Sequence, residues 1–139
     1  MNGNQQQARR WFDQAVRDAD AARFNEEGGF FEVACFLAQQ SAEKLLKALL
    51  HAHGQRLVFG HSTVALAEQC QEYGLDLGAA LGICRRLDQF YIPTRYPNGL
   101  PDKTPADFFD QESAAQALGH LTRLMALVTP LLPWGLEQD

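Results

Sequence analysis

The residues of this sequence that are best suited to bind an anion lie in one proline-rich segment, YIPTRYPNGLPDKTPADFF, residues 91–109. Four of the six prolines of the chain fall in this segment, at a regular spacing of four. The first two flank Arg95 and Tyr96 and restrict the backbone, so both side chains lose less conformational entropy on binding than they would in a glycine-rich loop. A guanidinium beside an aromatic ring can hold a phosphate and stack on a base, and Tyr91 offers a second ring.

The same residue types also fit a purely structural role. In that arrangement Tyr96 closes the end of a helical bundle, and Arg95 pairs with a helix C-terminus or with a carboxylate such as Glu43. The distance from the Arg95 guanidinium to Glu43 and Lys47 distinguishes the two interpretations. A closed ion pair indicates a structural contact, whereas an open cleft indicates a binding site.

A second group of polar residues lies in a long helical segment, residues 30–53, which contains no glycine or proline. At 100° per residue, the polar side chains of this segment gather in one arc of about 140°. They are Gln39, Gln40, Glu43, Lys44 and Lys47. One interpretation is a solvent-exposed face on which the Glu43–Lys47 pair contributes only about 0.2–0.5 kcal/mol. The other is a groove or partner surface, because Phe36 and Leu50 lie on the same arc.

The sequence predicts no metal ion and no cofactor. Its three cysteines, Cys35, Cys70 and Cys84, are far apart in segments predicted to be helical, so we expect small buried side chains. No group of cysteine and histidine residues has the spacing of a zinc site.

Hydrophobic periodicity and stop signals indicate the elements that must position these side chains. Glycines follow the first three helical segments, and Pro93 restricts Ile92 at the end of the fourth. Asp110 is a suitable N-cap for the last. The predicted helices span residues 5–25, 30–53, 62–73, 76–92 and 110–132. No segment alternates long enough to be a strand, so we predict an all-α fold, an up-and-down bundle of four main antiparallel helices plus a short one.

Length and composition predict a single domain over residues 1–139, with its core at about 8–132 and short flexible ends. The start of the chain is too polar for a secretory signal. Pro130 and Pro133 interrupt the last apolar run before the roughly 20 residues of a membrane span. We therefore expect a cytoplasmic protein. The net charge of −5 argues against broad electrostatic capture of nucleic acid, so any anion site must be local.

The order of these segments resembles a known family. The stretch FFEVACFLAQQSAEKLLKALLHAHG, then His61 at the start of the next helix, then YIPTRYPNG before the last helix, is similar to prokaryotic HEPN domains of the form with an Arg-Tyr-Pro loop. The resemblance covers residues 8–130. It implies an all-α bundle that usually forms a homodimer, and a nucleotide- or RNA-binding role, often as the partner of a small nucleotidyltransferase. Many relatives are metal-independent ribonucleases or toxins.

The chain departs from the ribonuclease motif of that family, which is an arginine, four to six residues, and then a histidine. The positions after Arg95 where the histidine is expected hold Leu100, Pro101 and Asp102. A formal match exists only at Arg56 and His61, in the connection between the second and third helices, where chance explains it easily. Toxins of the family that are silenced by tyrosine nucleotidylation carry the tyrosine two residues after the histidine, where this chain has Thr63.

The resemblance therefore favours a non-catalytic binding module. In this hypothesis Lys44, Lys47, Arg95 and His61 receive phosphates, Tyr91 or Tyr96 stacks on a base, and Gln40 and Glu43 orient the loop. It requires the segment before the last helix to fold onto the polar face of the second. One alternative is a ribonuclease or toxin that acts through Arg56 and His61 or through an unrecognised pair of residues. Another is a structural partner subunit that dimerises and binds a nucleotidyltransferase through exposed apolar residues such as Phe30, Phe31, Phe108 and Phe109.

Overall fold

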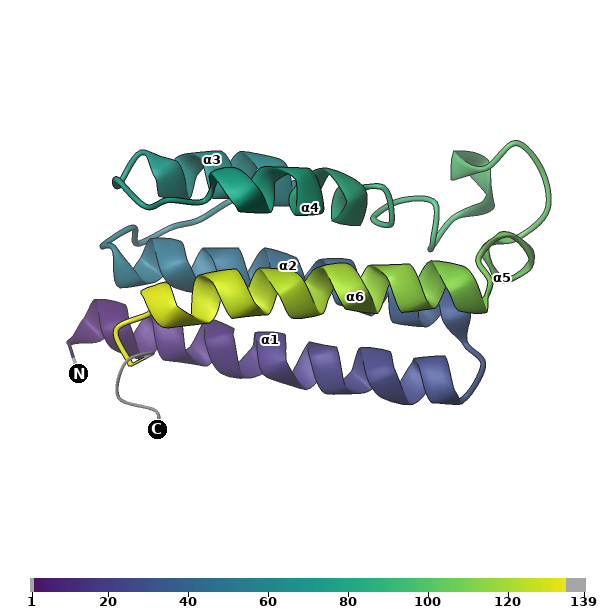
Figure 1. Ribbon diagram of the computed structural model, residues 1–139, viewed down its shortest axis with the longest axis horizontal. Helices are drawn as coiled ribbons and strands as arrows, with labels where there is room; N and C mark the ends of the chain where they lie inside the picture. Colours follow the sequence, from purple (N-terminus) through teal and green to yellow (C-terminus); the bar gives the residue numbers. More distant parts are fainter. Residues whose placement is uncertain (1, 135–139) are drawn as a thin grey trace.

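The protein consists of helices and their connections throughout residues 2–134, the part of the chain that the computed structural model describes (Figure 1). The elements are α1 (Gly3–Glu27), α2 (Phe31–Ala52), α3 (Thr63–Gln71), α4 (Gly78–Asp88), α5 (Pro105–Phe108) and α6 (Gln111–Val128), with 3₁₀ turns at Pro97–Gly99 and Thr129–Leu131. The predicted all-α fold class is confirmed. The short helix α5 was not predicted.

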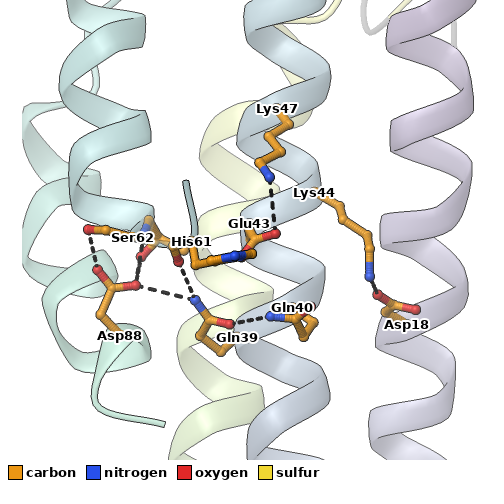
Figure 2. A network of polar contacts seen from close by, with 10 residues as sticks. Asp18, Gln39, Gln40, Glu43, Lys44, Lys47, His61, Ser62 and Asp88 are labelled. Carbon is orange, nitrogen blue, oxygen red and sulfur yellow. Dashed lines mark hydrogen bonds and ion pairs between the residues drawn. The ribbon is translucent and has the colours of Figure 1, made fainter. Parts of the chain in front are cut away.

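Helix α2 is the central element of the bundle. It contacts α1, α3, α4, α5 and α6. Helix α1 runs antiparallel along one flank of α2, the hairpin of α3 and α4 lies along the other, and α6 crosses in front of α2 in the view of Figure 1. The polar residues of α2 lie on the side that faces the viewer in Figure 2, between α1 and the α3–α4 hairpin.

Small side chains let α1 approach α2 closely. The buried positions of α1 are mainly alanines that are fully inaccessible to solvent, and the Ser41 hydroxyl of α2 donates a hydrogen bond of 2.6 Å to the Ala15 carbonyl of α1. Asn2 and Gln5 form a capping box that begins α1. Gly29, with φ of 84°, allows the tight turn into α2.

Helix α4 ends four residues earlier than the sequence predicts, at Asp88 instead of Ile92. Residues after Asp88 form successive turns, in which the amides of Phe90 and Arg95 donate to carbonyls three residues earlier. Pro93 has no amide hydrogen and keeps Ile92 out of the helical region, so the preceding turn cannot continue as a helix. Tyr91 therefore lies in the loop and not on the face of α4.

Helix α6 begins at the predicted N-cap. Asp110 forms a capping box with Ser113, whose backbone amide and hydroxyl both donate to the carboxylate and hold the Asp110 pKa below its ordinary value. The helix ends at Val128, earlier than predicted, because Pro130 tightens the last residues into a 3₁₀ turn.

The three cysteines are buried and unpaired, as predicted. Burial raises the pKa of Cys35 and Cys70 to about 12 and that of Cys84 to about 11. These thiols are therefore protonated at neutral pH and pack as small apolar side chains.

Candidate functional site

The polar residues of α2 are mostly buried, so the interpretation of this arc as a solvent-exposed face is wrong. The exposed fractions of Gln39, Glu43 and Lys47 are 0%, 4% and 6%. Leu50, on the same arc, is also fully buried. Side chains from α1 and from the α3–α4 side cover the groups, and Figure 2 shows them in the space between these helices. Buried charges destabilise a fold unless they are paired and hydrogen-bonded, so the partners of each group matter.

His61 is the group on this face that combines a titratable ring with access to solvent. Its Nδ1 lies 3.0 Å from Glu43 Oε1, so the imidazole donates to the carboxylate, while 59% of the side chain is exposed. The ring stacks on Tyr91, with centroids 5.0 Å apart and an interplanar angle of 17°. Glu43 Oε2 accepts a second bond of 3.3 Å from Lys47. The imidazole is thus held on one edge, and no hydrogen bond from residues 2–134 engages its Nε2.

Asp88, at the end of α4, anchors the segment that carries His61. Its carboxylate accepts hydrogen bonds from the Thr63 amide and hydroxyl, at 2.8 and 2.7 Å, and from the Ser62 hydroxyl at 2.9 Å. Gln39 adds a bond of 2.8 Å to the His61 carbonyl (Figure 2). Because a carboxylate at a helix N-terminus is electrostatically favourable, Asp88 both stabilises the start of α3 and fixes the position of His61.

Arg95 lies over three aromatic rings. Its guanidinium carbon is 4.9 Å from the centroid of Phe36, 4.7 Å from that of Tyr91 and 5.0 Å from that of Tyr96. Within residues 2–134, no carboxylate lies at ion-pair distance from this guanidinium. The Thr94 hydroxyl bonds to the Phe90 carbonyl and fixes the loop beneath it.

Arg95 therefore reaches the polar side of α2, at Phe36, although the proposed Arg95–Glu43 ion pair is absent from the described residues. The Glu43 carboxylate binds His61 and Lys47 instead. Tyr91 contacts both His61 and Arg95, and so joins them into one cluster of Phe36, His61, Tyr91, Arg95 and Tyr96, which we call the Arg95 cluster.

Neither lysine belongs to the Arg95 cluster: Lys44 points to α1, whereas Lys47 lies between Glu43 of α2 and Trp11 of α1. Lys44 forms an ion pair with Asp18 of α1 (Figure 2). It also lines a hollow of about 420 Å³ with Gln7, Arg10, Trp11 and Gln14. The Lys47 ammonium lies 5.3 Å from the Trp11 ring. Gln40 donates a hydrogen bond of 2.8 Å to Gln39, its neighbour in sequence. Of the eight predicted ligand-binding residues, His61, Tyr91, Arg95 and Tyr96 therefore belong to the Arg95 cluster.

The remaining predicted residues lie apart from the cluster. Arg56 is exposed in the connection between α2 and α3, and within residues 2–134 it has no side-chain hydrogen bond or ion pair. Phe30 and Phe108 are 60% and 53% exposed, but Phe109 is buried, because its ring packs against Phe90 at 6.0 Å. Phe31 is half-buried. The proposed apolar partner surface therefore keeps only two of its four residues.

Sequence reasoning did not identify Asp18, Asp88 or Trp11 as parts of this network. Tertiary packing brings each of them to α2 from another helix, 26 to 49 residues away in sequence, and no local pattern marks it. Within residues 2–134, no group of three histidine, cysteine, aspartate or glutamate side chains could hold a metal ion. No helix in the same part of the chain is long and apolar enough to cross a membrane.

The protein is thus an all-helical bundle that carries the cationic and aromatic Arg95 cluster against its central helix, α2. The family model described as "HEPN domain" matches residues 8–131. The chain therefore belongs to the HEPN domain family, as its resemblance predicted.

Two solved structures are similar over almost the same region. TT1696 from Thermus thermophilus is 35% identical, with a TM-score of 0.86, over 91% of this chain and 98% of that protein. ST0689, an archaeal HEPN homologue, is 31% identical, with a TM-score of 0.75, over 91% of this chain and 98% of that protein. The comparison with curated proteins gave no match.

Proposed function

We propose that this protein is a non-catalytic HEPN module that binds a nucleotide or RNA at the Arg95 cluster. The observation that carries the proposal is the arrangement of Arg95: an exposed guanidinium, held over aromatic rings, with no carboxylate partner in the part of the chain that the structure describes. Such a group is oriented in advance and keeps its N–H donors for a phosphate.

The neighbours of Arg95 fit the other parts of a nucleotide. Tyr96 is 49% exposed and presents a ring on which a base can stack. The free Nε2 of His61 can donate to a second phosphate oxygen when the ring is protonated, since Glu43 holds the opposite edge. In this arrangement Glu43 positions His61 and does not touch the ligand. Lys44 is paired with Asp18 on the α1 side and does not take part in this binding mode.

Calorimetry with ATP and with a short single-stranded RNA tests the proposal. Arg95→Gln removes the charged hydrogen bonds, so we expect affinity to fall about 10- to 100-fold. Stability should fall by at most about 1 kcal/mol, which is the range of an exposed cation–π contact.

Arg9 provides a matched control for the loss of a stacked arginine. It also lies over two rings, 5.6 Å from Phe12 and 5.1 Å from Trp134, but it is paired with Asp13. Arg9→Gln should leave binding unchanged. The proposal fails if wild-type protein shows no heat with either ligand, or if both substitutions weaken binding equally.

A ribonuclease is the second candidate, and the Glu43–His61 hydrogen bond favours it. A carboxylate that orients an imidazole, with the other ring nitrogen facing solvent, is the arrangement of a general acid–base. If RNA is cleaved, His61→Ala should abolish the cleavage and Arg56→Ala should not, because Arg56 lies outside the cluster. Intact RNA after incubation with wild-type protein excludes this candidate.

We also propose that the module works as a homodimer and as the partner of a nucleotidyltransferase, as its family membership favours. Light scattering of the purified chain measures the first, and co-purification with a nucleotidyltransferase encoded beside it measures the second. If the chain dimerises and binds the enzyme but responds to no nucleotide or RNA, the purely structural role replaces the binding role. Exposed Phe30 and Phe108 are then the first residues to substitute.

A further inference from the structure

A second cationic group lies on the outer face of α4 and α6, away from the Arg95 cluster. Arg86 is in the last turn of α4, and His120 and Arg123 are one helical turn apart on α6. Both arginines are exposed, and within residues 2–134 neither has a carboxylate at ion-pair distance. Helix α6 lies in front of α2 in Figure 1 and behind it in Figure 2, so this face is opposite the polar side of α2.

Arg123 and His120 are joined by a hydrogen bond that determines which nitrogen of the ring carries the proton. The Arg123 Nη2 lies 2.8 Å from the Nδ1 of His120. Because a guanidinium can only donate, Nδ1 accepts with its lone pair, the ring is neutral, and the hydrogen is on Nε2. Partial burial, then Arg123 and Arg86, lower the pKa of His120 below its ordinary value. The neutral ring is therefore an N–H donor at physiological pH.

The donors border an open hollow on α6. It has a volume of about 570 Å³ and is lined by Gln116, Gly119, His120, Thr122 and Arg123. At Gly119 no described atom, apart from its chain neighbours and the adjacent backbone of α6, lies within 4 Å of the place a Cβ would occupy. A glycine inside a helix costs about 0.5–1 kcal/mol relative to alanine, and here it leaves the backbone of α6 open to a ligand.

From this geometry we propose that Arg86, His120 and Arg123 form a second binding site, for a phosphoryl group. Three of the residues that line the hollow carry N–H donors, namely Arg123, His120 and Gln116. Thr122 already donates its hydroxyl hydrogen to the Leu118 carbonyl at 2.9 Å. A guanidinium fork binds two phosphoryl oxygens at once, and Arg86 adds a second positive charge from α4.

The phosphoryl group can belong to a small phosphate or nucleotide, or to the backbone of a nucleic acid. We would titrate ¹⁵N-labelled full-length protein with inorganic pyrophosphate at low salt and follow the amides by NMR. This experiment tests whether the hollow on α6 binds a phosphoryl group. We expect saturable shifts of the Gly119, His120 and Arg123 amides. A parallel titration with an eight-nucleotide RNA identifies the source, because a nucleic-acid site shifts the same amides at lower concentration, whereas a small-ligand site responds only to pyrophosphate.

Variants separate this site from the Arg95 cluster and from effects on folding. Arg123→Gln should weaken pyrophosphate binding at α6 at least tenfold, and Arg123→Lys, which keeps the charge but loses the fork, by less. Arg85→Gln is the matched control, since Arg85 is an exposed arginine in the same turn as Arg86, but Arg86 and not Arg85 acts electrostatically on His120. Arg95→Gln should leave the α6 shifts unchanged.

Two results overturn the proposal. One is the absence of saturable shifts at α6 in wild-type protein. The other is equal affinity of wild type and Arg123→Gln when thermal melts show that the variant is folded. Because these amides lie on the opposite face, either result leaves the function proposed for the Arg95 cluster untouched.

Discussion

At the scale of single residues, the polar side of α2 is a set of buried charges whose partners come from other helices. Glu43 is the central group, since it accepts from exposed His61 and from buried Lys47. The side chains of Lys47 and Glu43 are only 7% and 5% exposed, so little solvent screens the pair. Removing one member leaves the other charge buried without compensation, which is far more destabilising than losing a surface pair.

A double-mutant cycle at Glu43 and Lys47 tests this. We expect Glu43→Gln to lower the free energy of unfolding by about 3 kcal/mol, because it leaves the Lys47 ammonium buried without a countercharge. Lys47→Met should cost less, since Glu43 keeps His61 as a partner. The double variant should be more stable than the sum of the single changes implies, as measured by urea unfolding. Strict additivity would show that the two side chains do not interact in solution.

At the scale of the elements, the α3–α4 hairpin is what holds His61 in place. Asp88 binds the first residues of α3 through Ser62, Thr63 and Val64, although it belongs to α4. The hydroxyl oxygen of Thr63 also lies 3.0 Å from the Cys84 carbonyl of α4, so its one hydrogen is shared between this carbonyl and Asp88. The two short helices are therefore tied together at the end where His61 stacks on Tyr91.

Asp88→Ala should remove this connection and lower the free energy of unfolding by about 2 kcal/mol, which is the upper range for loss of an N-cap. Because His61 then loses its fixed position, we also expect weaker ligand binding at the Arg95 cluster, and faster amide exchange at the start of α3. Asp88→Asn, which keeps a side-chain acceptor, should retain more of both properties. If Asp88→Ala binds ligand as tightly as wild type, the hairpin does not position His61.

At the scale of the whole molecule, α2 packs against each of the other described α-helices. Its leucines at positions 45, 46, 49 and 50 are fully buried. The two tryptophans report on different contacts of α1: Trp11 of α1 stacks on His51 of α2 at 5.9 Å, and Trp134 packs on Phe12 of α1 at 5.5 Å. The single domain predicted from the length should therefore unfold as one unit.

Urea unfolding followed by tryptophan fluorescence and by circular dichroism should give coincident transitions. Trp11→Phe and Trp134→Phe variants isolate the signal of each tryptophan. If the midpoint from the Trp134 signal is lower than that from circular dichroism, the end of the chain unfolds separately. The single cooperative unit is then the wrong description.

The sequence by itself determined the helices, their approximate bounds and the family, because apolar periodicity, capping residues, glycines and prolines act locally. It also indicated that Arg95 and Tyr96 are held by prolines near the polar face of α2. Only the tertiary structure decided which partners these groups have. Glu43 binds His61 and Lys47 instead of Arg95, Lys44 binds Asp18, and Arg95 lies over aromatic rings. The physical reason is that ion pairs and stacking depend on which helix faces approach each other, and that depends on the packing of the whole core.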